Sequence, residues 1–248
     1  MKTEILKVDP KKPDGAVMDA AASYIKRGEL VAFPTETVYG LGGDAMDPGA
    51  SKAIYAAKGR PSDNPLIVHI ADAGDLYKVG EDVPKEAGLL AEAFWPGPLT
   101  MILKAGDLVP RETTGGLDTV AVRLPSHPGA RKMIECAGGF VAAPSANLSG
   151  RPSPTSAKYV IEDMDGRIEM ILDGGEGGIG LESTIVDLTV DPPQILRPGY
   201  ITRDMLQEVL GEVAVDATVL ALAAGTECDR APRAPGMKYR HYAPKGQL

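Results

Sequence analysis

Cysteine and large aromatic side chains are scarce in this chain of 248 residues. Its two cysteines, Cys136 and Cys228, lie far apart and have no histidine or cysteine close by. A disulfide framework or a structural zinc site needs several such residues at short spacing, so the composition argues against both. One tryptophan and three phenylalanines also provide little material for a binding surface built on aromatic stacking.

An excess of positive charge and long apolar runs are also absent. The net charge of −8 argues against nonspecific nucleic-acid binding by the whole surface, because neutralising phosphates needs clustered Lys and Arg, although a local basic cleft stays open. No window approaches the roughly 18 uncharged apolar residues of a membrane span. The polar amino terminus (MKTEILKVDPKK) lacks the apolar centre of a signal peptide. We therefore expect a cytoplasmic protein without membrane association.

The sequence does contain the material for a large α/β core. Hydrophobic residues make up 44% of the chain, enough for one large or two small domains, and 29 glycines with 21 prolines indicate many tight turns. Asp14 and Asp47 are placed to cap helices that end near Gly28 and Lys58. Further helical patterns cover residues 84–94 and 128–137, and apolar runs typical of buried strands cover residues 30–33, 66–70, 99–103, 120–125, 140–143 and 168–172.

Residues 58–66 (KGRPSDNPL) place two cations in one turn. Lys58 and Arg60 follow a helical run that Gly59 and Pro61 prevent from continuing. The planar fork of Arg60 and the compact charge of Lys58 could meet one small polyanion in an open cleft. Two solvated surface cations are the alternative, and this stretch alone does not exclude it.

Two predicted strands carry a polar residue inside an apolar run. His69 interrupts residues 66–70 and is either a hydrogen-bonded structural residue or part of a site. Arg123 lies within residues 120–125 and cannot be buried without an anionic partner. That partner is either an Asp or Glu of the protein or the carboxylate of a ligand.

Turns rich in hydroxyls and glycines follow several predicted strands. Residues 34–42 (PTETVYGLG) come directly after one of them, where ligands bind in α/β sheets. Residues 144–150 (PSANLSG) carry hydroxyls, an amide and backbone N–H groups that could cradle phosphate or ribose. The five glycines of residues 173–180 (DGGEGGIG) let the backbone approach a ligand closely. Neither the P-loop pattern nor GxGxxG after a strand is present. Residues 231–244 (APRAPGMKYRHYAP) form either a solvated basic tail or a lid over a bound anion.

Seven short segments, in their order along the chain, resemble the Sua5/YrdC family of threonylcarbamoyl-AMP synthases. The resemblance spans about residues 14–211. The segments are residues 34–41 (PTETVYGL), 58–66 (KGRPSDNPL), 95–100 (WPGPLT), 122–125 (VRLP), 144–150 (PSANLSG), 183–187 (STIVD) and 197–199 (RPG). Residues 234–244 resemble the linker of the longer Sua5 branch, so we expect a Sua5 chain with this linker but without the second, C-terminal Sua5 domain.

The resemblance implies a single α/β domain over residues 1–215, with a linker or lid tail over residues 216–248. Its twisted, largely mixed or parallel sheet and flanking helices would surround a concave, positively charged cavity. The implied reaction joins L-threonine, bicarbonate or CO2, and ATP into L-threonylcarbamoyl-AMP and pyrophosphate, the first step of N6-threonylcarbamoyladenosine (t6A) formation in tRNA. Mg²⁺ would accompany ATP, and downstream t6A transfer proteins and tRNA are the implied partners.

The resemblance also assigns site residues. L-threonine would contact Thr35, His69, Arg123 and Ser183. Lys58 and Arg60 would be the catalytic residues, and the triphosphate would also meet Ser62 and Asn64. The adenylate would lie among Thr119, Ser145, Asn147, Ser153 and Arg197, under a lid formed by Tyr239, Arg240 and Tyr242. No metal ligand is assigned to the protein, because Mg²⁺ on a nucleotide is held mostly by phosphates and water.

Two other functions share some of these features. An RNA-binding module is disfavoured by the acidic balance and by the lack of an aromatic platform. The carbamoyl-transfer domain of hydrogenase-maturation proteins occurs in longer chains with zinc-finger regions, and the cysteine pattern of such regions is missing.

Overall fold

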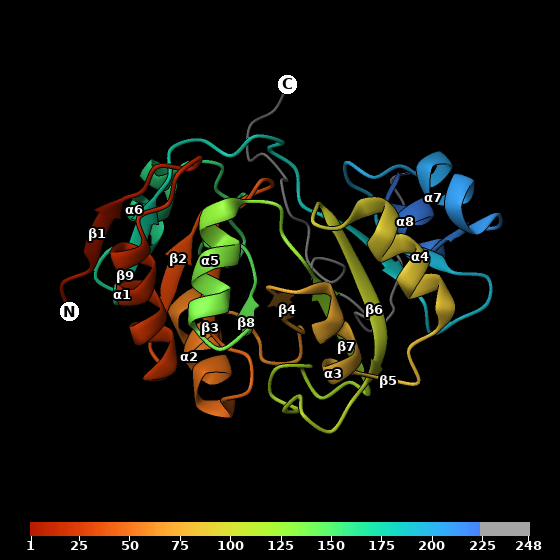
Figure 1. Cartoon of the computed structure of the whole chain (residues 1–248), viewed down its shortest axis with the longest axis horizontal. Helices are drawn as coiled ribbons and strands as arrows, with labels where there is room; N and C mark the ends of the chain where they lie inside the picture. Colours follow the sequence, from red (N-terminus) through yellow and green to blue (C-terminus); the bar gives the residue numbers. More distant parts are fainter. Residues whose placement is uncertain (224–248) are drawn as a thin grey trace.

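The computed structural model describes residues 1–223, which form one large mixed sheet with helices packed against it (Figure 1). The sheet has twelve strands within these residues, in the order β1-β9-β2-β3-β8-β4-β7-β6-β10-β11-β12, with β5 paired to β6. The strands are β1 (Glu4–Lys7), β2 (Val31–Phe33), β3 (Gly40–Asp44), β4 (Ile67–Ile70), β5 (Gly80–Glu81), β6 (Leu99–Ala105), β7 (Thr119–Arg123), β8 (Phe140–Ala143), β9 (Met170–Asp173), β10 (Thr184–Asp187), β11 (Gln194–Arg197) and β12 (Ala214–Val215).

Parallel and antiparallel pairs alternate through the centre of the sheet. Strand β4 runs parallel to β7 and antiparallel to β8, whereas β6 runs antiparallel to β7 and parallel to β10. The α/β fold with a mixed sheet is therefore confirmed. The helices are α1 (Gly15–Lys26), α2 (Pro48–Lys58), the 3₁₀ turn η1 (Ala73–Asp75), α3 (Leu76–Val79), α4 (Lys85–Phe94), α5 (Pro128–Cys136), α6 (Ala157–Met164), α7 (Arg203–Leu210) and α8 (Ala217–Ala223).

Capping residues define the two helices that the sequence predicted most directly. The Asp14 side chain accepts a hydrogen bond from the backbone N–H of Ala16 at the start of α1, at 2.9 Å. Asp47 does the same for Gly49 at the start of α2, at 2.7 Å, with Pro48 in the first turn. Helix α2 ends at Gly59, whose φ of 60° is the left-handed conformation that glycine adopts readily. Lys58 is therefore the last residue of α2.

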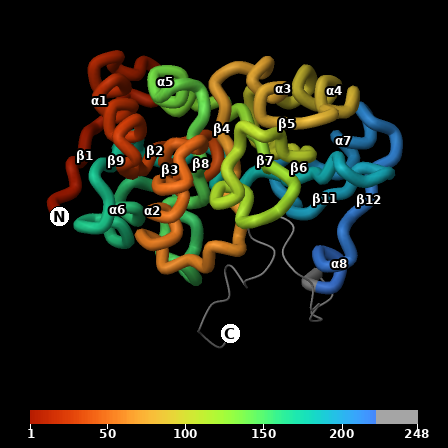
Figure 2. The backbone as a smooth tube through the Cα atoms, turned by 90° about the horizontal axis from the view of Figure 1, so that it is seen from below, coloured from red at the N-terminus to blue at the C-terminus, as the bar shows by residue number. Residues whose placement is uncertain are grey.

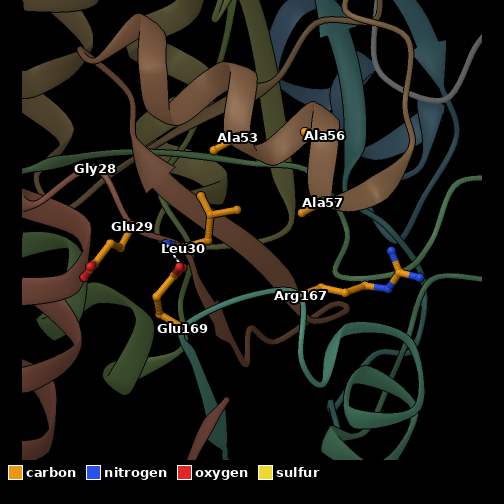
Figure 3. Close-up of a pocket in the computed structure, with 8 residues that line it drawn as sticks. All are labelled: Gly28, Glu29, Leu30, Ala53, Ala56, Ala57, Arg167 and Glu169. Carbon is orange, nitrogen blue, oxygen red and sulfur yellow. Dashed lines mark hydrogen bonds between the residues drawn. The ribbon is translucent and has the colours of Figure 1, made fainter. Parts of the chain in front are cut away.

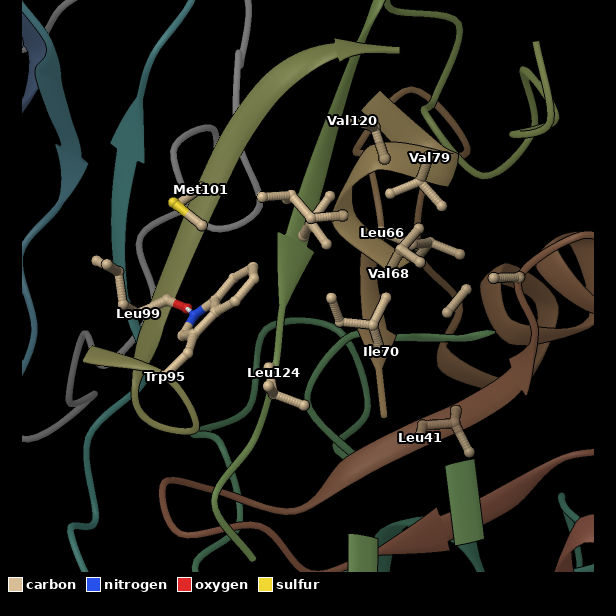
Figure 4. Packing of buried hydrophobic residues seen from close by; sticks show 14 of the residues in the cluster. Leu41, Leu66, Val68, Ile70, Val79, Trp95, Leu99, Met101, Val120 and Leu124 are labelled. Atoms are coloured by element: carbon tan, nitrogen blue, oxygen red, sulfur yellow. Dashed lines mark hydrogen bonds between the residues drawn. The ribbon is translucent and has the colours of Figure 1, made fainter. Parts of the chain in front are cut away.

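Helices cover both sides of the sheet. Figure 2 shows α1 and α5 together on one side and α2 and α6 on the other. The side chains of α1 and α5 pack with Phe33 and Val141 in one core cluster. A larger cluster gathers apolar residues of α2, α3, α4, α6 and α7 together with residues of the sheet. Within it the Trp95 indole lies beside Leu99 and Met101 and donates from Nε1 to the Leu99 carbonyl at 2.7 Å (Figure 4).

A third, smaller apolar cluster lies on the other face of the central strands. Side chains alternate between the two faces of a strand, so Val68 and Val122 face the larger core while their neighbours face the opposite way. The third cluster consists of Ile67 on β4, Ala121 on β7, Ile102 on β6, Ile185 on β10 and Leu196 on β11. We call these five residues the apolar floor.

Strand β3 and helices α6 and α8 were missed by the sequence analysis. Residues 40–43 (GLGG) read as a turn because glycine disfavours strands. The structure shows why glycine stands there: a Cβ on Gly42 would lie 2.8 Å from Cε1 of Phe33 and 2.9 Å from Cγ1 of Val141. The glycines of β3 leave room for the Phe33 ring from the neighbouring strand. None of the helices within residues 1–223 is long and apolar enough to cross a membrane.

We expect Gly42→Ala to lower the free energy of unfolding by about 1–3 kcal/mol, because it overpacks the contact between Phe33 and Val141. Gly15→Ala is the matched control, since a Cβ there meets nothing within 4 Å in the first turn of α1. Urea unfolding of the two variants and the wild type measures the difference. Equal midpoints for all three proteins would show that the Phe33 ring does not require the glycine.

Candidate functional site

Polar side chains form a line across neighbouring strands, next to the apolar floor. His69 on β4 pairs in register with Arg123 on β7, and Arg123 pairs with Thr100 on β6. The Thr100 hydroxyl lies 2.7 Å from the hydroxyl of Ser183, which directly precedes β10. Arg197 at the end of β11 donates to the Ser183 backbone carbonyl and to its hydroxyl, both at 3.0 Å. We call these five residues the polar row.

The turn after β2 closes over one end of the polar row. The hydroxyl of Thr35 lies 2.9 Å from that of Thr37 and donates to the Val38 carbonyl at 2.7 Å. The Thr37 hydroxyl in turn accepts a hydrogen bond from Nη1 of Arg123 at 3.0 Å. Both threonines are buried. The turn therefore presents its hydroxyls to the polar row rather than to solvent.

The glycine-rich segment at residues 174–180 packs directly on this turn. The backbone N–H of Ile179 donates to the Glu36 carbonyl at 2.9 Å, and that of Gly180 donates to the Thr37 carbonyl at 3.3 Å. A Cβ on Gly177 would lie 2.9 Å from the Thr37 carbonyl oxygen. Here the glycine permits the close approach of two backbone segments of the protein, whereas the sequence suggested the approach of this backbone to a ligand.

Arg123 has a protein carboxylate as its partner. Its Nη2 lies 2.6 Å from Oε1 of Glu36, and Nε donates to the Gly97 carbonyl at 3.4 Å. Only 5% of the Arg123 side chain and 14% of the Glu36 side chain are exposed. The sequence left open whether the partner of Arg123 is a carboxylate of the protein or of a ligand. In the structure it is the carboxylate of Glu36, to which the sequence analysis gave no role.

His69 is held as a neutral imidazole. It is buried, its Nδ1 lies 3.1 Å from the Ile67 carbonyl oxygen, and the Phe33 ring meets it edge to face. Burial lowers the His69 pKa to about 3, and the positive charge of Arg123 contributes in the same direction. At neutral pH His69 can donate or accept a hydrogen bond but does not carry a charge.

Lys58 forms a second polar centre with the turn after β8. Its Nζ donates to the carbonyls of Ser145 and Asn147, each at 2.5 Å, and its own carbonyl accepts from the Ser149 N–H at 2.9 Å. Lys58 is 3% exposed, so the expectation that it lines an open cleft is wrong. Burial lowers the Lys58 pKa well below its usual value, Arg60 lowers it further, and the carboxylate of Asp163 acts in the opposite direction.

Helix α6 supplies the residue that holds this turn. The Asp163 carboxylate accepts from the Leu148 N–H at 2.9 Å and forms an ion pair with Arg151. Within the turn, the Asn147 amide donates to the Arg151 carbonyl at 2.8 Å, and the Ser145 hydroxyl donates to the Asn147 side chain. The apolar spacing of Val160 and Met164 could have revealed α6 and thereby Asp163.

The other predicted nucleotide residues are spread around Lys58 and along the sheet. Arg60 is half-buried and donates from Nη2 to the carbonyls of Asn64 and Pro65, at 3.2 and 3.0 Å. Asn64 is buried and Ser62 is exposed. Thr119 begins β7 and lies on the same strand face as Arg123.

Two residues predicted beside the adenylate lie near Ser183. Arg197 contacts Ser183 directly, and the Ser153 hydroxyl donates to the Glu182 carboxylate at 2.8 Å. Tyr239, Arg240 and Tyr242 fall outside the described residues. Thr37, Glu36 and Thr100 belong to matching sequence segments but were given no role in the site, because no pattern in the sequence shows which side chain of a motif faces the site.

Strand β8 links the two polar centres. It runs antiparallel to β4, with Val141 opposite His69. Ser145 lies two residues after the end of β8, in the turn that Lys58 contacts. The apolar floor lies on the same strand face as His69 and Arg123. This arrangement offers polar groups for a small molecule at the polar row and cationic side chains for an anion at Lys58 and Arg60.

An open hollow elsewhere on the molecule contains none of the predicted site residues. It is lined by the α1–β2 connection, by alanines of α2 and by the residues that precede β9 (Figure 3). Glu169 at its edge accepts a hydrogen bond from the Leu30 N–H at 2.9 Å. We therefore build no function on this hollow.

Comparison with known proteins gives matches along nearly the whole chain. The Sua5/YciO/YrdC family model, described as "Telomere recombination", matches residues 23–199. A second model, "Threonylcarbamoyl-AMP synthase, C-terminal domain", matches residues 201–248. The expectation that the C-terminal Sua5 domain is missing is therefore partly wrong, because the chain contains sequence that matches it.

Individual relatives agree with the family models. A threonylcarbamoyl-AMP synthase of Pyrococcus abyssi is 55% identical over 92% of this chain, and one of Bacillus subtilis is 51% identical over 92%. The chain spans just under two thirds of the length of these curated relatives, 66% and 64% respectively. The solved structure of P. abyssi Sua5 complexed with L-threonine superposes with a TM-score of 0.92 at 52% identity, over 98% of this chain and 69% of that one. With a family model that matches most of its length and a fold that superposes closely, the chain belongs to the Sua5/YciO/YrdC family.

Proposed function

We propose that the protein synthesises L-threonylcarbamoyl-AMP from L-threonine, bicarbonate or CO2, and ATP, with release of pyrophosphate, as the first step of t6A formation in tRNA. The observation that carries the proposal is the pair of polar centres that β8 links, a buried Arg123 beside the apolar floor and a buried Lys58 at the turn after β8. Further support comes from the similarity to a Sua5 whose structure was solved with L-threonine.

In this proposal the polar row binds L-threonine. Arg123 contacts the carboxylate, because guanidinium and carboxylate form paired, charge-assisted hydrogen bonds. Thr35, His69 and Ser183 contact the remaining polar groups of the substrate. A neutral His69 suits this task, since a charged imidazolium beside Arg123 would add repulsion in a buried site.

The Lys58 end of the face binds the nucleotide. Arg60, Ser62 and Asn64 contact the triphosphate, while Thr119, Ser145, Asn147 and Ser153 line the adenylate. Lys58 fixes the turn that carries Ser145 and Asn147 and places its charge beneath the phosphates. Together Lys58 and Arg60 stabilise the negative charge that develops as pyrophosphate leaves. Mg²⁺ enters with ATP, held mainly by phosphate oxygens and water.

The reaction requires two bond-forming steps in one enclosed place. The threonine amine adds to the carbon of CO2, or displaces water from bicarbonate, and forms a carbamate. A carbamate oxygen then attacks the α-phosphorus of ATP, and the bond from that phosphorus to the bridging oxygen of pyrophosphate breaks. Catalysis consists of positioning the reactants and stabilising charge, and a dry, apolar floor protects the carbamate from water.

The remaining parts of the assignment belong to the same proposal. Arg197 would contribute to the nucleotide end through its contact with Ser183. Tyr239, Arg240 and Tyr242 would close over the nucleotide, within the sequence that matches the C-terminal domain model. Downstream t6A transfer proteins and tRNA would receive the product in the cytoplasm.

The reaction itself gives the first test. Protein incubated with ATP, Mg²⁺, bicarbonate and L-threonine should release pyrophosphate and form an adenylated carbamate, detected by mass spectrometry. Omission of L-threonine should abolish both signals. Pyrophosphate release that is indifferent to threonine would falsify the proposed function.

Substitutions should separate the roles of the two cations. Arg60→Ala should lower turnover by about 10²-fold through lost charge stabilisation, with a stability cost of about 1 kcal/mol for its two carbonyl contacts. Lys58→Met should lower turnover and also cost about 1–3 kcal/mol, because two buried carbonyls lose their donor. Lys52→Ala on the exposed face of α2 is the control for both assays. Normal turnover of Arg60→Ala would show that this residue is not part of the site.

The buried His69 should make stability depend on pH. Its folded pKa of about 3 lies below the unfolded value of about 6.5, so the unfolded chain binds more protons between these values and stability falls as pH decreases through that window. His69→Gln should show a shallower loss of unfolding free energy between pH 6.5 and 4 than the wild type. Parallel stability curves for the two proteins would contradict a neutral, buried His69.

A further inference from the structure

We propose that Glu36 determines specificity for α-amino acids: it receives the ammonium group of the substrate while Arg123 receives the carboxylate. The inference rests on the proposed binding of threonine at the polar row, and it concerns a residue to which the sequence analysis gave no role. Its basis is the hydrogen bonding of the buried pair formed by Glu36 and Arg123.

Arg123 keeps donors for a ligand even while it is paired with Glu36. Its guanidinium has five N–H groups. Three contacts are made within the described residues: Nη2 to Oε1 of Glu36, Nη1 to the Thr37 hydroxyl, and Nε to the Gly97 carbonyl. The two remaining N–H groups, one on each Nη, are available to a ligand carboxylate. Glu36 can therefore stay in place when a substrate binds.

Glu36 has an oxygen that lacks a donor. Oε1 accepts from Arg123, whereas Oε2 is buried and has no hydrogen-bond partner in the part of the chain that the structure describes. A buried carboxylate oxygen without a donor is unfavourable, and an ammonium group supplies both a donor and the opposite charge. In an α-amino acid both charged groups are on the same carbon, so a carboxylate held by Arg123 brings the ammonium close to Glu36.

The charge balance of the pair explains why the ligand should be a zwitterion. Arg123 and Glu36 together are neutral, and His127, the titratable neighbour that interacts with Glu36, has its pKa lowered by burial. A ligand with only a carboxylate would place two carboxylates on one guanidinium, with repulsion in a region of low dielectric. A zwitterion adds no net charge, and each of its groups meets its opposite.

The position of Glu36 is held by backbone contacts in addition to its ion pair with Arg123. Its carbonyl accepts from the Ile179 N–H at 2.9 Å, and the neighbouring Thr35 and Thr37 bind one another. Glu36→Gln keeps the size of the side chain and can still accept a hydrogen bond from Arg123. It removes only the negative charge, which makes it the appropriate variant.

The test compares two ligands on two proteins. Isothermal titration calorimetry, without ATP or bicarbonate, gives the Kd of L-threonine and of the 2,3-dihydroxybutanoate with the same configuration, in which a hydroxyl replaces the amine. The wild type should prefer threonine by about 10²-fold or more. In Glu36→Gln the Kd for threonine should rise by about 10²-fold and that for dihydroxybutanoate should stay the same or fall, so that the preference is lost. Glu176→Gln, an exposed carboxylate in the glycine-rich segment, is the control and should behave like the wild type.

Other results would overturn the inference. Equal weakening of both ligands would mean that Glu36 only supports Arg123, and tighter threonine binding in Glu36→Gln would mean that it only competes for Arg123. A wild type that binds no threonine, or that binds both ligands equally, would also contradict it. Because the titration needs no turnover, a wild type that discriminates between the ligands but makes no pyrophosphate would refute the proposed reaction and leave this inference standing.

Discussion

The buried charge of Arg123 is the constraint on which the arrangement of the site depends. A guanidinium in the middle of an apolar sheet face needs an anion and several acceptors, since an unpaired buried charge is strongly destabilising. Glu36 and Thr37 supply them from the turn after β2, and the Gly97 carbonyl supplies one from the loop before β6. Arg123 therefore holds both the turn after β2 and the loop before β6 in position. The glycine-rich segment is positioned in turn by its packing on the turn after β2.

Lys58 meets the same requirement in a different way. Its side chain is as buried as that of Arg123 but contacts the neutral carbonyls of Ser145 and Asn147, while the carboxylate of Asp163 is engaged by Leu148 and Arg151. The two cations therefore have different partners. Arg123 is neutralised by an ion pair with a carboxylate, whereas Lys58 forms hydrogen bonds with backbone carbonyls. A polyanion consequently gains more from approaching Lys58 and Arg60 than from approaching Arg123.

Local signals in the sequence predicted the parts of the fold that depend on local physics. The Asp14 and Asp47 caps, the end of the helix at Lys58 and the apolar strand runs all depend on backbone conformation within a few residues, and all were confirmed. The sequence did not predict strand β3, because its glycines make room for the ring of Phe33, which belongs to another strand. The partner of Arg123 and the burial of Lys58 could not be predicted for the same reason: each depends on contacts between segments more than 80 residues apart.

Within residues 1–223 Arg123 is paired with a carboxylate and Lys58 is not, and this difference assigns the two substrates of the proposed reaction to different ends of the site. A neutral Arg123–Glu36 pair suits a zwitterionic amino acid, and the Lys58–Arg60 end suits a triphosphate, so neither ligand gains by taking the place of the other. When L-threonine is bound at the polar row, the carbamate formed on its amine extends over the apolar floor toward the α-phosphate of the ATP bound near Lys58 and Arg60. The space between the polar row and the Lys58 end must then hold the carbamoylated amino acid and the α-phosphate together.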